Sequence, residues 1–213
     1  MRRRCLLLAM AIGMAACTPP TPRNTGVYIL VDTSGSYDRN VRKAEQIVLY
    51  ALSRLQSGDS IAVARINTGS FTEKDIIDEA TFDDQPSTAD LQKRTFAARV
   101  KNYLDHSKAA PYTDITGGLL QAIEFLDEKH TAHKEILIFS DMDQDLAKGY
   151  VRTDIPLDFK GFDVVALNVT KLRSDNLDPR LYLGRLAKWK STVEKAGGQW
   201  RVINDLDDLH AVL

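Results

Sequence analysis

Cysteine is almost absent from this sequence, which has two cysteines, Cys5 and Cys17, among 213 residues. Both lie near the N-terminus, so a disulfide framework is excluded for the rest of the chain, and a domain there must be stabilised by its buried core. Neither sign of charge dominates, because 28 basic and 29 acidic residues give a net charge of −1. Without a clustered excess of lysine and arginine, we expect no nucleic-acid partner.

Several motifs of cofactor and metal chemistry are also missing. The sequence contains neither G-x-x-x-x-G-K nor G-x-G-x-x-G, the loops that cradle phosphates, and its four histidines lack the H-E-x-x-H spacing of zinc enzymes. What is present is an ordinary globular composition, with 44% hydrophobic and 27% charged residues. A packed domain is therefore expected, and wholesale disorder is not.

The N-terminal segment has the pattern of a targeting sequence. An apolar run, residues 5–16, follows three arginines at positions 2–4. A helix that spans a bilayer needs about 20 apolar residues, so this shorter run fits a secretory signal peptide that covers residues 1–16. The run ends in the sequence MAAC at 14–17, which resembles the lipobox of bacterial lipoproteins, with Met14 where leucine is usual.

The lipobox resemblance implies cleavage before Cys17 and lipidation of this cysteine. Several acyl chains anchor a protein stably where one chain is marginal. The resemblance therefore implies a protein of the bacterial cell envelope that is held at a membrane by a lipid anchor. Thr18 occupies the position where aspartate usually marks retention in the inner membrane, which favours the outer membrane in a cell with two membranes.

A short linker is expected between the anchor and the folded domain. Residues 17–26 include prolines at 19, 20 and 22, a spacing that prevents a helix or a sheet strand. We expect a stiff, extended spacer here. The domain then covers residues 27–213.

Apolar runs of strand length alternate with amphipathic segments in the domain. The expected strands are residues 27–31, 60–66, 136–139, 162–169 and 200–203, with a charged edge strand at 75–82. The expected helices are residues 40–55, 88–106, 179–196 and 205–212, and a further one that starts at 113. This alternation predicts an α/β fold with a doubly wound, mostly parallel open sheet and helices on both faces, a Rossmann-like arrangement.

Polar residues at two strand ends and one helix start form a candidate site. The first strand leads into D-x-S-x-S, with Asp32, Ser34 and Ser36, while Thr113 stands at the start of a helix and Asp141 follows the strand at 136–139. Together these residues resemble the metal-ion-dependent adhesion site of von Willebrand factor A domains, and the order of elements resembles that family over the whole domain. The resemblance implies that these five residues hold a metal.

The chemistry of these side chains agrees with the resemblance. Aspartate, serine and threonine offer only oxygen, which selects hard cations such as Mg²⁺, with Mn²⁺ or Ca²⁺ as alternatives. Ligands of open α/β sheets bind at the carboxyl ends of strands where the strand order reverses, so Asp32 and Asp141 meet if their strands are neighbours. The family uses the metal to dock a carboxylate of a protein partner and not as a catalyst, which implies that this chain is not an enzyme.

Two other readings of the same residues stay open. Asp141 and Asp143 form D-x-D after an apolar strand, a pattern similar to that of haloacid-dehalogenase-type phosphohydrolases, in which the first aspartate is a nucleophile and the second a general acid. The sequence would then encode a Mg²⁺-dependent phosphohydrolase. In the other reading the metal only holds loops together.

Overall fold

A single six-stranded sheet organises the chain, and the computed structural model describes residues 24–35, 40–205 and 208–209 of it. The strand order is β3-β2-β1-β4-β5-β6, with only β3 antiparallel to its neighbour. The strands are β1 (Thr25–Asp32), β2 (Ser60–Ile66), β3 (Ile76–Thr81), β4 (His133–Phe139), β5 (Phe162–Leu167) and β6 (Gln199–Ile203). The predicted mostly parallel α/β sheet is therefore confirmed.

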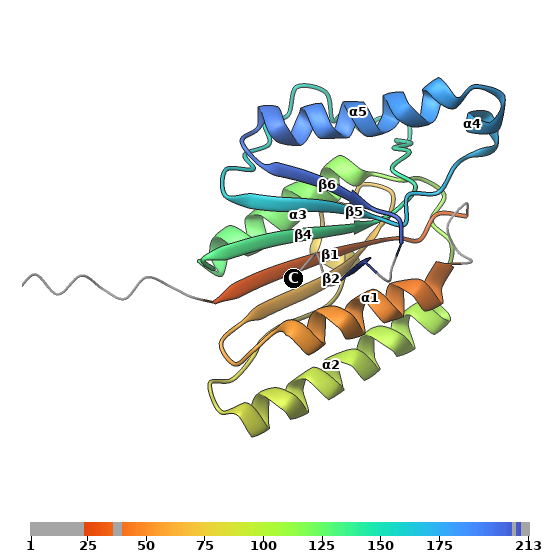
Figure 1. The fold of residues 1–213 in the computed structure, drawn as a ribbon. Coiled ribbons are helices and arrows are strands. Elements are labelled where there is room, and N and C mark those ends of the chain that lie inside the picture. Colours follow the sequence, from red (N-terminus) through yellow and green to blue (C-terminus); the bar gives the residue numbers. More distant parts are fainter. Residues whose placement is uncertain (1–23, 36–39, 206–207, 210–213) are drawn as a thin grey trace, which may run out of the picture.

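Helices cover both faces of this sheet, as Figure 1 shows. The helices are α1 (Val41–Arg54), α2 (Pro86–His106), α3 (Ile115–Glu128), α4 (Arg173–Leu177) and α5 (Pro179–Lys195), with a 3-10 turn at Glu73–Asp75. Helices α1 and α2 pack on one face, and α3 and α5 on the other. The predicted doubly wound arrangement is thus present.

The two faces of β1 explain why its sequence is continuously apolar. Val27, Ile29 and Val31 point into the core beneath α1 and α2, whereas Tyr28 and Leu30 point into the core beneath α3 and α5. A strand buried on both faces has no solvent side that would call for alternating polar residues. This burial fixes β1 in the middle of the sheet.

Differences from the sequence-based expectation concern short or peripheral elements. The 3-10 turn and α4 were not predicted, because both are short and polar. The strand expected at 75–82 is present as β3 and lies at the sheet edge, as its charge pattern indicated. The helix expected at 205–212 falls mostly outside the described residues, and no helix among the described residues is long and apolar enough to cross a membrane.

The strand order reverses between β1 and β4. From β1 the chain continues outward through β2 to β3, and then returns to β4 on the other side of β1. Val31 pairs with Phe139 in this parallel ladder, so the residues after each strand leave the sheet side by side. The site residues that follow β1 and β4 therefore share one edge of the sheet.

A buried glutamate on β4 makes the stability of the fold depend on pH. Glu135 is 7% exposed, and burial raises its pKa to about 8, against the opposing effect of Arg201 at 3.4 Å. The unfolded chain releases this proton near pH 4.5, whereas the folded chain keeps it up to about pH 8. The free energy of unfolding therefore falls as pH rises through this window.

We expect Glu135→Gln to remove this dependence. Between pH 5 and pH 9 the wild-type chain should lose about 2–5 kcal/mol more stability than the variant, because glutamine stays neutral throughout. Urea unfolding at pH 5, 7 and 9 measures the difference. Parallel stability curves for the two proteins would contradict the burial argument.

Candidate metal site

Asp32 is the last residue of β1 and is only 3% exposed. Its Oδ1 accepts a hydrogen bond from the backbone N–H of Ser34 at 2.8 Å, which turns the chain sharply as it leaves the strand. Its Oδ2 accepts a hydrogen bond from the Ser140 hydroxyl at 2.6 Å. The two hydrogen bonds fix the carboxylate at the junction of β1 and β4.

The charge of Asp32 has no cationic partner among the described residues. Burial raises the pKa of Asp32, hydrogen bonds from Ser140 and Ser34 oppose the rise, and the charge of Asp143 adds to it. Other buried aspartates differ, because Asp75, Asp114 and Asp175 each pair with an arginine. A cation bound beside Asp32 would supply the compensation that the protein itself does not.

Backbone hydrogen bonds bring the three predicted segments together. Ala110 N–H donates to the carbonyl of Thr33 at 2.7 Å, which ties the loop before Thr113 to the end of β1. Thr113 in turn exchanges two backbone hydrogen bonds with Asp145, at 2.8 and 3.0 Å. The segments that carry Ser34, Thr113 and Asp141 are thus neighbours in space. Ser36, also predicted as a ligand, lies outside the described residues.

The loop after β4 holds Asp141 in a buried position, 2% exposed. Its Oδ1 accepts a hydrogen bond from the Asp143 N–H at 3.0 Å, and the Met142 N–H donates to the Ser140 hydroxyl, also at 3.0 Å. Met142 has φ 63°, in the left-handed region that costs energy for a side chain of this kind. This bend shapes the loop that carries Asp141 at the carboxyl end of β4, the strand that pairs with the strand of Asp32.

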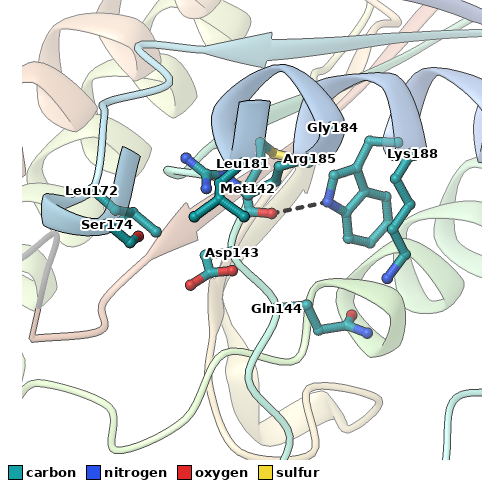
Figure 2. Close-up of a pocket in the computed structure, with 10 residues that line it drawn as sticks. Met142, Asp143, Gln144, Leu172, Ser174, Leu181, Gly184, Arg185 and Lys188 are labelled. Carbon is teal, nitrogen blue, oxygen red and sulfur yellow. Dashed lines mark hydrogen bonds between the residues drawn. The ribbon is translucent and has the colours of Figure 1, made fainter. Parts of the chain in front are cut away.

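Two side chains of helix α5 donate hydrogen bonds to the backbone of the same loop. The Trp189 indole donates to the Met142 carbonyl at 2.9 Å (Figure 2), and Arg185 Nε donates to the Asp141 carbonyl at 3.0 Å. Arg185 is also paired with Asp175 at 2.8 Å. Burial would lower the pKa of Arg185, but Asp175 outweighs it, and Asp143 and Asp141 add to the rise. A cavity of about 320 Å³ lies between this loop, α4 and α5.

Asp114, next to Thr113, is a structural residue that the sequence analysis did not single out. It is fully buried and caps α3 by accepting a hydrogen bond from the Gly117 N–H at 2.8 Å. Its other oxygen accepts from the Ser70 N–H at 3.2 Å and from Arg152 Nη2 at 2.7 Å. A Cβ on Gly117 would lie 2.5 Å from the Asp114 carboxylate, so glycine is needed at this close approach. These contacts fix the position of Thr113.

Local sequence signals point to some of these supporting residues and not to others. Ser140 directly precedes Asp141 at the strand end, and Asp114 stands where an N-cap aspartate is favoured, so both were detectable by position. Arg152 and Arg185 contact the site from 38 and 44 residues away, and no local pattern marks them. The contacts of these two arginines are therefore found only in the structure.

The donor set suits a hard cation. Asp32 and Asp141 are carboxylates and Ser34 and Thr113 carry hydroxyls, so each of these candidate ligands offers oxygen alone. No group of three or more histidine, cysteine, aspartate or glutamate side chains with metal-binding geometry occurs among the described residues. A cation here would therefore be held by two carboxylates together with neutral oxygens.

The fold resembles that of several solved protein structures. No protein-family model and no curated protein matches the sequence. Among solved structures, a von Willebrand factor type A protein from Catenulispora acidiphila has a TM-score of 0.52 at 15% identity, covering 89% of this chain and 41% of that one. The PilB minor pilin from Streptococcus sanguinis has a TM-score of 0.50 at 12% identity, covering 89% and 59%. This chain spans less than two thirds of either protein, and its fold is that of von Willebrand factor type A domains.

Proposed function

We propose that this chain binds a protein partner through a divalent cation held by Asp32, Ser34, Ser36, Thr113 and Asp141. The observation that carries the proposal is the Asp32 carboxylate, which is 3% exposed, held by neutral hydrogen-bond donors and without a cationic partner among the described residues. A buried charge of this kind is costly unless a counter-charge accompanies it. The bound cation supplies that counter-charge.

Mg²⁺ is the cation that we propose, with Mn²⁺ and Ca²⁺ as alternatives. The oxygen-only donors exclude soft-ligand metals such as copper(I). Mg²⁺ keeps part of its coordination sphere for water or an incoming oxygen ligand, because proteins seldom supply all six ligands. We propose that a carboxylate of the partner fills the open position. The two carboxylates of this chain together do no more than neutralise the ion, so the ion carries no excess negative charge that would repel an anionic ligand.

Exposed apolar side chains next to the site support a protein partner. Tyr112, Phe71, Tyr150 and Val151 are exposed by 37, 52, 44 and 68%. Tyr112, Phe71 and Val151 directly neighbour Thr113, Ser70 and Arg152 in the sequence. The Arg152 guanidinium lies over the Tyr150 ring, 5.7 Å from its centroid. Large apolar and aromatic side chains are enriched in protein interfaces. The partner would therefore cover these side chains while its carboxylate reaches the cation.

Metal binding should be visible as a change in stability. In saturating Mg²⁺, at about 100 times the dissociation constant, the folded chain gains about 2.7 kcal/mol, so addition of EDTA should lower the melting temperature without unfolding the domain. Differential scanning calorimetry with and without Mg²⁺ measures this shift. An identical melting temperature in Mg²⁺ and in EDTA, with no metal in the purified protein, would count against the site.

The proposed location is the bacterial cell envelope, with a lipid on Cys17 and the outer membrane favoured where two membranes exist. Cys17→Ser should move the protein from the detergent phase to the aqueous phase in a partitioning experiment, because Cys17 is the one cysteine left after cleavage before it. Cys5→Ser is the matched control and should leave partitioning unchanged. Equal partitioning of wild type and Cys17→Ser would contradict lipidation.

We also infer that the site is not catalytic. In the phosphohydrolase reading, Asp141 would attack phosphorus and Asp143 would move a proton. The backbone N–H of Asp143 donates to Asp141 Oδ1 within a tight turn after the fourth strand of the sheet, which gives the Asp141 carboxylate a structural role, while the Asp143 side chain is exposed. Phosphatase activity with Mg²⁺ that is lost in Asp143→Asn would overturn the inference.

A further inference from the structure

An acidic groove lies on the sheet face that α3 covers, away from the proposed metal site. It runs between α3 and the edge strand β3 and has a volume of about 590 Å³. The residues that line it are Glu73, Ile76, Asp78, Glu79, Gln121, Glu124, Phe125 and Glu128. None of them belongs to the metal site, so the groove is a separate feature of the surface.

The sheet register explains why space is left here. Tyr28, Ala62 and Glu79 pair side by side across β1, β2 and β3. The Tyr28 ring is covered by Phe125 of α3, with the ring centroids 5.5 Å apart. Ala62 contributes only a methyl group between the tyrosine and the edge strand, so α3 and β3 leave a hollow above it.

The groove carries a concentrated negative charge. Asp78 is paired with Arg99 at 2.8 Å, but Glu73, Glu79, Glu124 and Glu128 form no ion pair among the described residues. The cation closest along α3 is Lys129, whose ammonium lies over the Phe125 ring at 5.0 Å. Four carboxylates without ion pairs along one groove attract cationic groups and repel anionic ones.

One buried polar atom in the groove, and a second beneath Phe125, lack hydrogen-bond partners. Gln121 lines the groove and is 7% exposed, and its Oε1 has no partner. The Tyr28 hydroxyl is also buried without a partner, and its pKa is raised by burial and by the charges of Glu79, Asp75 and Glu124. Buried polar atoms normally find a partner. Gln121 Oε1 is an acceptor that a donor entering the groove would satisfy.

We propose that this groove binds a basic segment of a protein partner, with an arginine or lysine side chain that donates hydrogen bonds to Gln121 Oε1 and is flanked by Glu79 and Glu124. An arginine side chain brings five N–H donors on a long stem, which suits an amide acceptor at the bottom and carboxylates at the rim. A divalent cation fits less well, because no group of three such carboxylates has metal-binding geometry among the described residues and, unlike the proposed metal site, the groove is lined by no hydroxyl. This inference does not depend on the metal site.

The test uses a fluorescein-labelled tetra-arginine peptide with the full chain in detergent. EDTA is present to remove divalent cations, so that no binding through the proposed metal site contributes to the signal. Fluorescence anisotropy gives the affinity, and amide chemical shifts of the isotope-labelled protein give the location. We expect shifts in β3 and in residues 121–128. Glu79→Gln and Glu124→Gln should each weaken binding at least about fivefold, and Gln121→Leu, which changes no charge, about tenfold.

Matched controls separate the groove from general charge attraction. Glu194→Gln, on α5 and exposed, should change binding less than about twofold, and a tetra-citrulline peptide should not bind. Melting temperatures check that every variant is folded. Equal effects of Glu194→Gln and Glu124→Gln, or unchanged binding by Gln121→Leu, would overturn the proposal. Mg²⁺ that shifts the same amides and competes with the peptide would reveal a cation site instead.

Discussion

Asp32→Ala should lower the affinity for Mg²⁺ more than about 100-fold and abolish metal-dependent partner binding. Changes outside the ligand shell of a metal cost about 10–100-fold, and this change removes an inner ligand together with a full negative charge. Ser34 and Thr113 cannot replace that charge, because their hydroxyls are neutral. Isothermal titration with Mg²⁺ measures the affinity, and a pull-down in Mg²⁺ or EDTA measures partner binding.

The fold should survive this substitution. The lost carboxylate is desolvated and without a cationic partner among the described residues. Its removal costs the hydrogen bonds from Ser140 and Ser34, about 1–3 kcal/mol each, and the relief of the buried charge offsets part of this cost. Asp143→Asn is the matched control, since Asp143 is an exposed acid on the neighbouring loop. It should bind Mg²⁺ within a few-fold of wild type. A folded Asp32→Ala protein that still binds its partner in EDTA would show that recognition does not need the ion.

Asp114→Ala should destabilise the fold by about 3–5 kcal/mol, the largest loss of stability that we expect from one substitution here. The variant leaves the Arg152 guanidinium without its partner, and it also leaves the N–H groups of Gly117 and Ser70 without an acceptor. Arg152 is 15% exposed, so water compensates little of its charge. Urea denaturation measures the loss.

Asp178→Ala is the control for this prediction. Asp178 also caps a helix, α5, and also pairs with an arginine, Arg180 at 2.8 Å, but both side chains are more exposed, at 34 and 89%. Its removal should cost about 1 kcal/mol. The double variant Asp114→Ala/Arg152→Met should recover part of the loss, because the uncompensated charge is gone. Equal effects of Asp114→Ala and Asp178→Ala would contradict the role given to burial.

The central part of the fold was predictable from the sequence for a physical reason. The centres of strands β1, β4 and β5 are buried on both faces and therefore contain apolar runs, at residues 27–31, 136–139 and 164–167. The order of the strands in the sheet comes from the structure and was not predicted. Helix α4 and the turn at Glu73–Asp75 were missed because they are short and owe their positions to tertiary contacts, such as the ion pairs Asp175–Arg185 and Asp75–Arg65.

The site was predictable only in its outline. The apolar runs mark the ends of strands and the start of a helix, and the polar residues at these points are Asp32, Ser34, Thr113 and Asp141. The structure brings the segments that carry them together. The supporting contacts were not predictable. The hydrogen bond from Ser140 to Asp32 joins residues 108 apart, and that from Arg152 to Asp114 joins residues 38 apart. Such pairs follow from the packing of the sheet and leave no periodic signal.

The most direct test of the proposed cation site is Mn²⁺ titration of the isotope-labelled full chain in detergent, because paramagnetic Mn²⁺ broadens the amide signals near it. We predict one site, with signals lost at residues 32–35, 112–115 and 140–143, and recovery of these signals in Asp32→Ala at the same Mn²⁺ concentration. Unbroadened signals at these residues, or broadening centred on the acidic groove at Glu79 and Glu124, would contradict the account.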